Sequence, residues 1–308
     1  MSDPELPAAV RSYLAARPAA GWAAFAADLG VGGLTVPEEY GGAGRPDLAE
    51  VAVVAAELGR VLSPLPFLQS AVLAVEALRA AGSDHRLGEL AEGSVSATVV
   101  FPGPLRLSGG RLYGVARHVL EGEVVLAYAG GALVEAVPSR REPYRTMDAS
   151  RPLGELVFDG VPARVLGDGG GWERVRDLGI VALAAEQAGG AARCLEAATA
   201  YAKVREQFGR PIGAFQAIKH KLAEVHMAVE TAQAAVEAAA RGELPAVAAG
   251  SVCGTAYLLA AGENIQVHGG IGVTWEHEAH RYFKRATADA CLLGSPREHR
   301  ARLAGTLF

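Results

Sequence analysis

The sequence has few cysteines, few aromatic residues and no long run of apolar or like-charged side chains. Only three cysteines occur in 308 residues, at Cys194, Cys253 and Cys291, and none forms a CxxC pair. The odd count argues against a disulfide framework, so we expect buried free thiols in a reducing cytoplasm. No apolar run reaches the ~18 residues of a membrane helix. The N-terminal MSDPELPAAV also lacks the basic segment of a signal peptide, so we expect a cytoplasmic protein with no membrane partner.

The charge balance argues against a nucleic-acid partner. The formal net charge is −5, and no basic tract exceeds a few residues. Hydrophobic residues make up 50% of the chain and charged residues 20%, which is typical of a packed globular protein. The length is sufficient for two or three modest domains with a large core.

Several common catalytic and phosphate-binding motifs are absent. The sequence has no GxGxxG after a strand, no GxxxxGK[ST], no GxSxG and no HExxH. The GDGGG run at Gly167–Gly171 reads as a flexible connection into a helix. His277 and His280 lie three residues apart beside Glu276, but further ligands at a suitable distance are missing. We therefore expect no metal site.

Periodicity divides the chain into three parts. Apolar residues recur at helical spacing over 6–29, 47–61 and 68–81. Short β-rich runs separated by Gly and Pro turns follow from about Val95 to Leu166. The predicted fold class is α+β, with an N-terminal helical domain (1–93), a small middle β-barrel or sandwich module (94–168) and a C-terminal four-helix bundle (172–308).

The predicted bundle begins with two long helices over 172–240. In the second of these, a core-facing stripe follows helical spacing, at Phe215, Ile218, Leu222, Val225 and Val229. The segment Ala246–Val267 is nearly all small and apolar, so we expect it to be buried on most sides. A fourth helix is expected from about Glu276 to Leu293, and a short helix ends the chain.

Two breaks between these helices combine charge, aromatic rings and glycine. Arg205 is expected in the last turn of one helix, Phe208-Gly209 ends it, and Phe215-Gln216 opens the next. The second break contains Gly269-Gly270, whose backbone amides a ligand can approach closely. An arginine, a ring and an amide near helix ends suit an anionic, planar ligand such as a dinucleotide. Spacing alone favours the other interpretation, two helix-hairpin turns with a capping arginine.

These stretches resemble one enzyme family. The runs REQFGRPIGAFQ (Arg205–Gln216) and QVHGGIG (Gln266–Gly272) look like motifs of the acyl-CoA dehydrogenases. GLTVPEEYGGAG (Gly33–Gly44) and ELGR (Glu57–Arg60) are also similar to that family. The likeness covers nearly the whole chain in order, and the family has the same helix–β–helix layout.

The resemblance implies an FAD flavoenzyme that desaturates an acyl-CoA thioester between its α and β carbons. It also implies a homo- or hetero-tetramer of acyl-CoA dehydrogenase subunits, because in the family each FAD contacts two of them. Electrons are expected to pass to an electron-transfer flavoprotein. The cofactor-binding positions carried over by motif are Arg205, Phe208, Gln216, Gln266, Gly269 and Gly270, with Phe215 and His268 as further candidates.

The chain departs from the family at the catalytic base. Most members place a glutamate in an x-E-G-T motif, and here Leu293 of Leu292-Leu293-Gly294-Ser295 stands at that position. A subset places the base upstream of RxQFG, near Gly179, which is not acidic either. Glu186 lies two turns further along, where an interhelical polar contact is an equally good interpretation. Glu276 and Glu278 are further carboxylates, better read as solvated.

The family's TEPxxGSD-like loop in the β module is also missing, with only Val100–Gly103 near that point. Three hypotheses follow. The chain is a base-less subunit of a heteromeric acyl-CoA dehydrogenase, a self-sufficient homo-oligomer with a relocated base, or a scaffold without flavin. A bulky acyl group such as a sterol side chain is suggested by analogy with the family only.

Overall fold

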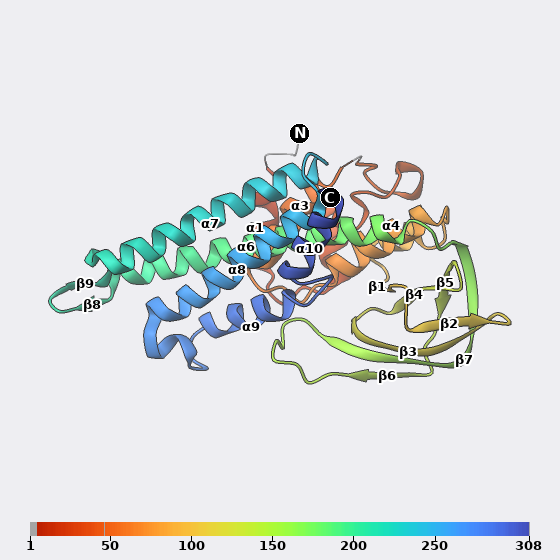
Figure 1. Cartoon of the computed structure of the whole chain (residues 1–308). Helices are drawn as coiled ribbons and strands as arrows, with labels where there is room; N and C mark the ends of the chain where they lie inside the picture. Colours follow the sequence, from red (N-terminus) through yellow and green to blue (C-terminus); the bar gives the residue numbers. More distant parts are fainter. Residues whose placement is uncertain (1–4, 46, 308) are drawn as a thin grey trace. The chain divides into compact units, whose positions relative to one another are not determined.

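The computed structural model describes residues 5–45 and 47–307 (Figure 1). The chain forms two compact units. Unit 1 comprises residues 1–51 and 64–179, and unit 2 comprises 52–63 and 180–308. The fold is α+β, as the sequence predicts, with helices at both ends and strands between them. The finer division into three domains stays a prediction.

The helical part of unit 1 follows the predicted periodicity. Its helices are α1 (Leu6–Ala16), α2 (Trp22–Leu29), the start of α3 (Ala49–Arg60), α4 (Val75–Ala80) and α5 (Leu87–Glu92). Gly30 ends α2 with a φ of 66°, a conformation that costs glycine little. The predicted helix over 68–81 opens instead with a π-helical stretch, Leu68–Ala74, before α4. Glu38 and Glu39 lie exposed in the short 3₁₀ turn Glu38–Tyr40 (η2), as expected of a solvated loop; a second such turn is Val31–Gly33 (η1).

The β module is one continuous sheet of seven strands. They are β1 (Ala97–Val100), β2 (Leu105–Ser108), β3 (Arg111–Leu120), β4 (Val124–Ala129), β5 (Ala132–Ala136), β6 (Arg140–Pro143) and β7 (Leu153–Asp168). The order is β1-β4-β5-β7-β3-β2, and β6 also pairs with β7. The 16-residue β7 pairs with β5 in one half and with β3 and β6 in the other, so it joins the two parts of the module.

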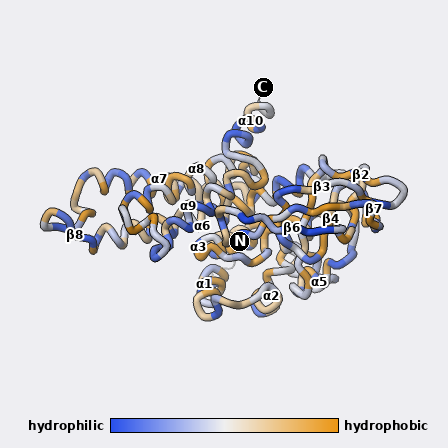
Figure 2. The backbone as a smooth tube through the Cα atoms, turned by 90° about the horizontal axis from the view of Figure 1, so that it is seen from below, coloured by the Kyte–Doolittle hydropathy of each residue, from blue (hydrophilic) through white to orange (hydrophobic). Residues whose placement is uncertain are grey.

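The sequence did not predict β2 and β6. β6 has the sequence RREP, is exposed throughout and is blue in Figure 2, so it lacks the apolar alternation of a strand. The inner faces of the other strands form one core, which includes Leu112, Val134, Leu156 and Phe158.

The predicted flexible connection at Gly167–Gly171 is wrong in its first half. β7 continues through Asp168, and a Cβ on Gly167 would lie 2.0 Å from the carbonyl oxygen of Ala81. The Gly169 amide donates to the Gly131 carbonyl at 2.9 Å. Gly167 is therefore needed for close packing, and the chain passes almost directly into the next helix.

Unit 2 consists mainly of long helices packed through small residues (Figure 1). They are most of α6 (Trp172–Val204), α7 (Gln216–Ala240), α8 (Ala246–His268), α9 (Ala279–Asp289) and α10 (Pro296–Leu307), with the end of α3. A Cβ on Gly59 of α3 would lie 2.0 Å from the Glu186 carbonyl oxygen of α6, and one on Gly189 would lie 1.9 Å from that of Ala56. Glycine at these positions lets the two backbones touch.

The predicted stripe on α7 is buried only in part. Val225 and Val229 belong to the unit 2 core with Tyr257 and Leu62, whereas Ile218 and Leu222 are half-buried near the N-terminus of the helix. α8 is largely buried, as expected from its small residues. With the 3₁₀ turn that follows, it spans Ala246–Val273 and is apolar enough for a membrane span; more than half of its most apolar window is buried in the protein, as in a core helix.

The last two helices differ from the prediction of one helix over 276–293. α9 starts at Ala279, where the backbone amide donates to His277 Nδ1 at 3.1 Å. It ends at Asp289, and Leu293 and Gly294 follow with φ values of 57° and 115°. A capping box then starts α10: the Ser295 amide donates to the Glu298 carboxylate at 2.7 Å and the Glu298 amide donates to Ser295 Oγ at 3.2 Å.

The cysteines correspond to the prediction at two of three positions. Cys194 and Cys253 are buried free thiols, and burial raises the pKa of both, for Cys253 to about 12. Cys291 is exposed, because it lies in the turn after α9 and not within a helix.

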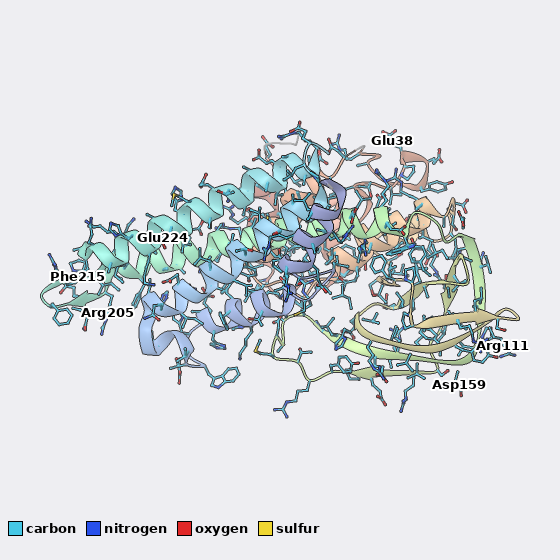
Figure 3. The ribbon with its side chains drawn as sticks, viewed as in Figure 1. Glu38, Arg111, Asp159, Arg205, Phe215 and Glu224 are labelled. Atoms are coloured by element: carbon cyan, nitrogen blue, oxygen red, sulfur yellow. The ribbon has the colours of Figure 1, made fainter. Side chains whose placement is uncertain are left out.

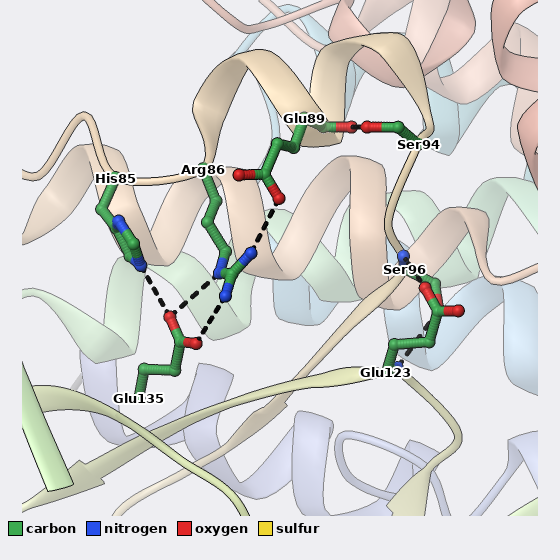
Figure 4. A network of polar contacts seen from close by, with 7 residues as sticks. All are labelled: His85, Arg86, Glu89, Ser94, Ser96, Glu123 and Glu135. Carbon is green, nitrogen blue, oxygen red and sulfur yellow. Dashed lines mark hydrogen bonds and ion pairs between the residues drawn. The ribbon is translucent and has the colours of Figure 1, made fainter.

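A charged network in unit 1 connects the segment before α5 with strand β5 (Figure 4). The Glu135 carboxylate accepts from Arg86 Nη2 at 2.9 Å and from Arg86 Nε at 3.1 Å, and His85 Nε2 lies 2.8 Å away. The pKa of Glu135 is lowered mainly by the two hydrogen bonds from the Arg86 guanidinium, and to a smaller extent by the His85 contact. Arg86 itself has a φ of 65°, so this pair also stabilises an unfavourable backbone conformation.

We expect Glu135→Gln to destabilise unit 1 by about 1–3 kcal/mol, because the half-buried Arg86 loses its charged partner. The lowered pKa means that Glu135 stabilises the fold fully above the ordinary glutamate pKa of about 4.3 and loses this contribution as the pH falls through the folded value. Chemical denaturation at pH 7 and in steps down to pH 3 should show a shallower acid loss in the variant. Glu121→Gln, at an exposed position, is the control; equal effects of both changes would contradict the assignment.

Candidate functional site

The first candidate stretch forms a tight hairpin and not a helix end. α6 ends at Val204, and the Arg205 amide still donates to the Tyr201 carbonyl at 2.9 Å. Two short strands follow, β8 (Glu206–Gln207) and β9 (Arg210–Pro211), and then a 3₁₀ turn, Ile212–Ala214 (η4). Arg205 thus lies just beyond the helix, which corrects its predicted place in the last turn.

The hairpin places an aromatic ring in solvent. Phe208 and Gly209 form its two-residue turn with φ values of 53° and 75°, the left-handed pair of a type I′ turn. Phenylalanine rarely adopts this conformation, so the backbone is strained at a residue whose ring is 91% exposed. The ring meets that of Phe215 edge-on at 6.0 Å, and the Arg210 guanidinium lies over Phe215 at 4.2 Å.

The second stretch is the end of α8. Gln266 is exposed, and His268 is the last helical residue. Gly269 follows with φ 64° and ψ −143°, a region that is almost restricted to glycine. A Cβ on Gly269 or Gly270 would meet no atom within 4 Å, so both backbones are open to an approaching group.

The two stretches meet at one end of unit 2. The rings of Tyr201 and His268 lie 4.3 Å apart, and Val267 packs with Ala198 and Ala202 of α6. Figure 3 shows Arg205 and Phe215 at this end of the helices. The proximity of the two stretches, which the spacing alone left open, is therefore present in the structure.

The residues at this end suit a dinucleotide. Arg205 and Gln216 are exposed, the Phe208 ring has almost no cover from its own chain, and two glycines leave backbone open. A cation and an amide can bind phosphate oxygens, and an exposed ring can cover a flat heterocycle. The exposed Phe208 is the observation that fits a bound group best, since the type I′ turn holds this residue in a left-handed conformation that presents it to solvent.

The family's usual base positions are occupied by residues that cannot accept a proton. Leu293 lies half-buried in the turn after α9 with a left-handed φ of 57°. Gly294 after it packs closely, because a Cβ there would lie 2.9 Å from His299 Cε1. Gly179 offers no side chain.

Glu186 is held in a buried ion pair. Its side chain accepts from Arg285 Nη1 on α9, and both residues are buried, Arg285 almost completely. Arg285 Nη2 also donates to the Ser63 carbonyl at 3.3 Å, after the end of α3. The structure therefore favours the interhelical contact over a free proton acceptor for Glu186. The sequence singled out Glu186 but gave no signal for Arg285.

The remaining carboxylates and histidines have other partners. Glu278 is exposed and pairs with Arg193 at 2.9 Å, and Glu276 is exposed. Hydrogen bonding by Thr274 lowers the pKa of Glu276. The His277 ring contacts that of His268, whereas the His280 ring contacts that of Trp275, so the two side chains do not share a ligand site. Within 5–45 and 47–307, no cluster of three or more potential metal-binding side chains occurs.

The chain belongs to the acyl-CoA dehydrogenase family. The family's N-terminal domain model matches residues 5–91, and its C-terminal domain model matches residues 177–307. The fold class and the sequence resemblance therefore agree on an oxidoreductase family.

Individual relatives are similar over nearly the full length. The chain is 39% identical to the acyl-CoA dehydrogenase IpdE2 of Mycobacterium tuberculosis, over 96% of this chain and 90% of that protein. It is 40% identical to FadE34 of the same organism, over 87% of this chain but 39% of the longer protein.

Among solved structures, the ChsE4-ChsE5 complex from Mycobacterium tuberculosis matches with a TM-score of 0.87 and 25% identity, over 100% of this chain and 98% of that one. A Tcur3481-Tcur3483 steroid ACAD variant matches with a TM-score of 0.85 and 27% identity, over 98% of this chain and 96% of that one.

We expect Arg285→Met to destabilise unit 2 by about 3–5 kcal/mol, because it leaves the Glu186 carboxylate buried without its cation. The double variant Glu186→Leu with Arg285→Met should recover most of this loss, since an apolar pair of similar volume avoids the burial of charge. Urea unfolding of the single and double variants measures both effects. Arg281→Met, on the exposed side of α9, is the matched control, and a double variant no more stable than the single one would exclude a coupled pair.

Proposed function

We propose that this chain is an FAD-binding subunit of a heteromeric acyl-CoA dehydrogenase whose catalytic base is supplied by a partner chain. The observation that carries the proposal is Leu293, an apolar residue at the position where the family carries its glutamate. Glu186, the best substitute, is engaged by Arg285. Within residues 5–45 and 47–307, the chain thus retains residues suited to a flavin, whereas the base positions of the family carry no carboxylate and Glu186 is engaged in an ion pair.

The reaction requires two groups at the acyl chain. A carboxylate removes the α proton, and FAD, when bound, accepts a hydride from the β carbon. In this chain Arg205 and Gln216 would bind phosphate oxygens of the cofactor, and Phe208 would cover one of its flat rings. The amides around Gly269 and Gly270 would approach the dinucleotide on the side of Gln266. Phe215 supports this arrangement by contacting Phe208 and Arg210.

The comparisons support a mixed assembly. Two similar solved structures carry paired names, ChsE4-ChsE5 and Tcur3481-Tcur3483, and the first is described as a complex. In FadE34 the matching segment is 39% of the protein, so there a relative of this chain is covalently joined to a longer segment. Such a fusion is what a required partner predicts.

The assembly is tested by producing the chain alone and together with an acyl-CoA dehydrogenase chain that carries a glutamate at the base position. Flavin absorbance after purification and bleaching by acyl-CoA are the two measurements. We expect a chain that is colourless or inactive alone, and a yellow, active protein after co-expression. A yellow and active protein from the single chain would exclude an obligatory partner.

The second hypothesis, a self-sufficient homo-oligomer with Glu186 as base, predicts that Glu186→Gln abolishes turnover while the flavin remains bound. The third, a scaffold, predicts no flavin in either preparation. Under our proposal, a co-expressed complex with Glu186→Gln keeps turnover in proportion to the folded protein. Thermal unfolding of the variant separates lost stability from lost chemistry.

The substrate class follows from the family, an acyl-CoA thioester. One similar structure is named a steroid ACAD, which favours a bulky, sterol-derived acyl group for this chain as well. Electrons would leave to an electron-transfer flavoprotein. Cytoplasmic localisation agrees with the two buried free thiols.

Phe208→Ala should weaken FAD binding by about tenfold or more, because loss of one stacking ring costs about 1–3 kcal/mol. Protein stability should change little, since the ring is 91% exposed. Flavin titration of the apo-complex measures the affinity, and Phe208→Tyr, which keeps the ring, is the control. Unchanged affinity in the alanine variant would remove Phe208 from the cofactor site.

A further inference from the structure

Three aromatic rings from three separate segments are in contact at the end of unit 2 that carries the candidate cofactor residues. The His268 ring lies 4.3 Å from that of Tyr201 on α6 and 4.3 Å from that of His277 in the turn before α9. Both neighbouring rings are tilted against it, with interplanar angles of 30° and 43°. His268, which contacts both of them, is only 6% exposed.

The edge of the His268 ring is fixed as well. Nδ1 lies 2.8 Å from the backbone carbonyl of Asn264, one helical turn earlier, so this nitrogen carries the proton of the neutral ring. Burial lowers the pKa of His268, and the neighbouring His277 acts in the same direction. The His268 ring is therefore neutral at pH 7.

The residues that carry the other two rings connect to the two breaks. The carbonyl of Tyr201 accepts the amide of Arg205 at 2.9 Å, and the Arg205 carbonyl accepts the amide of Ile212 at 2.8 Å across the hairpin. His277 accepts the amide of Ala279 and so begins α9. His268 itself is the last residue of α8, and Gly269 with its unusual backbone conformation follows directly.

We propose that His268 is a positioning residue that holds the Arg205–Ile212 hairpin and the Gly269-Gly270 turn in one fixed arrangement, without contacting the cofactor itself. The expected effect on FAD affinity rests on the proposed function. The effect of His268 on the order of the hairpin does not, because it involves unit 2 alone. It replaces the expectation that His268 binds the cofactor directly. A ring that is 6% exposed, contacts two other rings and bonds a backbone carbonyl has little surface left for a ligand.

The experiment uses His268→Ala and His268→Phe in the co-expressed complex and in the chain alone. The phenylalanine keeps a flat ring in contact with Tyr201 and His277 and loses only the Nδ1–H contact. The Asn264 carbonyl is not orphaned by this loss, because it lies within the regular bonding of α8. The exposed His226 on α7 provides the control, His226→Ala.

Two measurements are made. Backbone hydrogen exchange of 205–212 should be at least about tenfold faster in His268→Ala, because the ring contacts that order the hairpin are lost, and near the wild-type rate in His268→Phe. Exchange in β4 and β5, in the other unit, should be unchanged in both. FAD affinity of the complex should fall about tenfold with alanine and return with phenylalanine.

The outcomes are distinguishable. If alanine leaves exchange of 205–212 unchanged, or phenylalanine fails to restore it while β4 and β5 remain protected, the positioning role is wrong. A loss of FAD affinity without faster hairpin exchange would also overturn it, in favour of direct contact. If the wild-type complex binds no FAD, the proposed function fails, while the exchange experiment still decides whether His268 holds the hairpin.

Discussion

The arrangement of unit 2 depends on one buried ion pair, between Glu186 of α6 and Arg285 of α9. Both charges are removed from solvent, so neither is tolerated without the other. Arg285 also bonds the Ser63 carbonyl, which ties the end of α3 to the same point. Gly59 and Gly189 allow α3 and α6 to touch along their backbones. A single guanidinium thus links three segments of unit 2.

The position of α9 matters because of what precedes it. His277 lies two residues before the first residue of α9 and accepts that residue's amide, so the helix and the ring of His277 are placed together. The His277 ring contacts that of His268, and the His268 ring contacts that of Tyr201, whose carbonyl accepts the Arg205 amide at the start of the hairpin. A continuous series of contacts therefore leads from the buried pair to the exposed Phe208. The candidate site is at the surface, but the residues that position it are connected to the buried ion pair.

The sequence predicted the parts of this arrangement that are local. Helical periodicity identified the long helices, and glycine and proline marked most of their ends. It missed the type I′ hairpin because EQFGRP has no alternating apolar pattern, and it missed β6 for the same reason. The Glu186–Arg285 partners are 99 residues apart, and no local rule connects them. The cofactor residues came from family resemblance, since spacing alone favoured a plain helix hairpin.

Under the proposed function, the retention of the flavin residues and the loss of the base have different structural costs. A cofactor surface needs many residues from several segments in one geometry. Here the ring contacts of His268 and the Glu186–Arg285 ion pair both contribute to that geometry. A base needs one carboxylate at one position. Leu293 lies half-buried in a turn between α9 and the capping box of α10, outside both helices. Under this proposal one substitution removes the base from this chain, whereas loss of the cofactor surface would require changes in several segments.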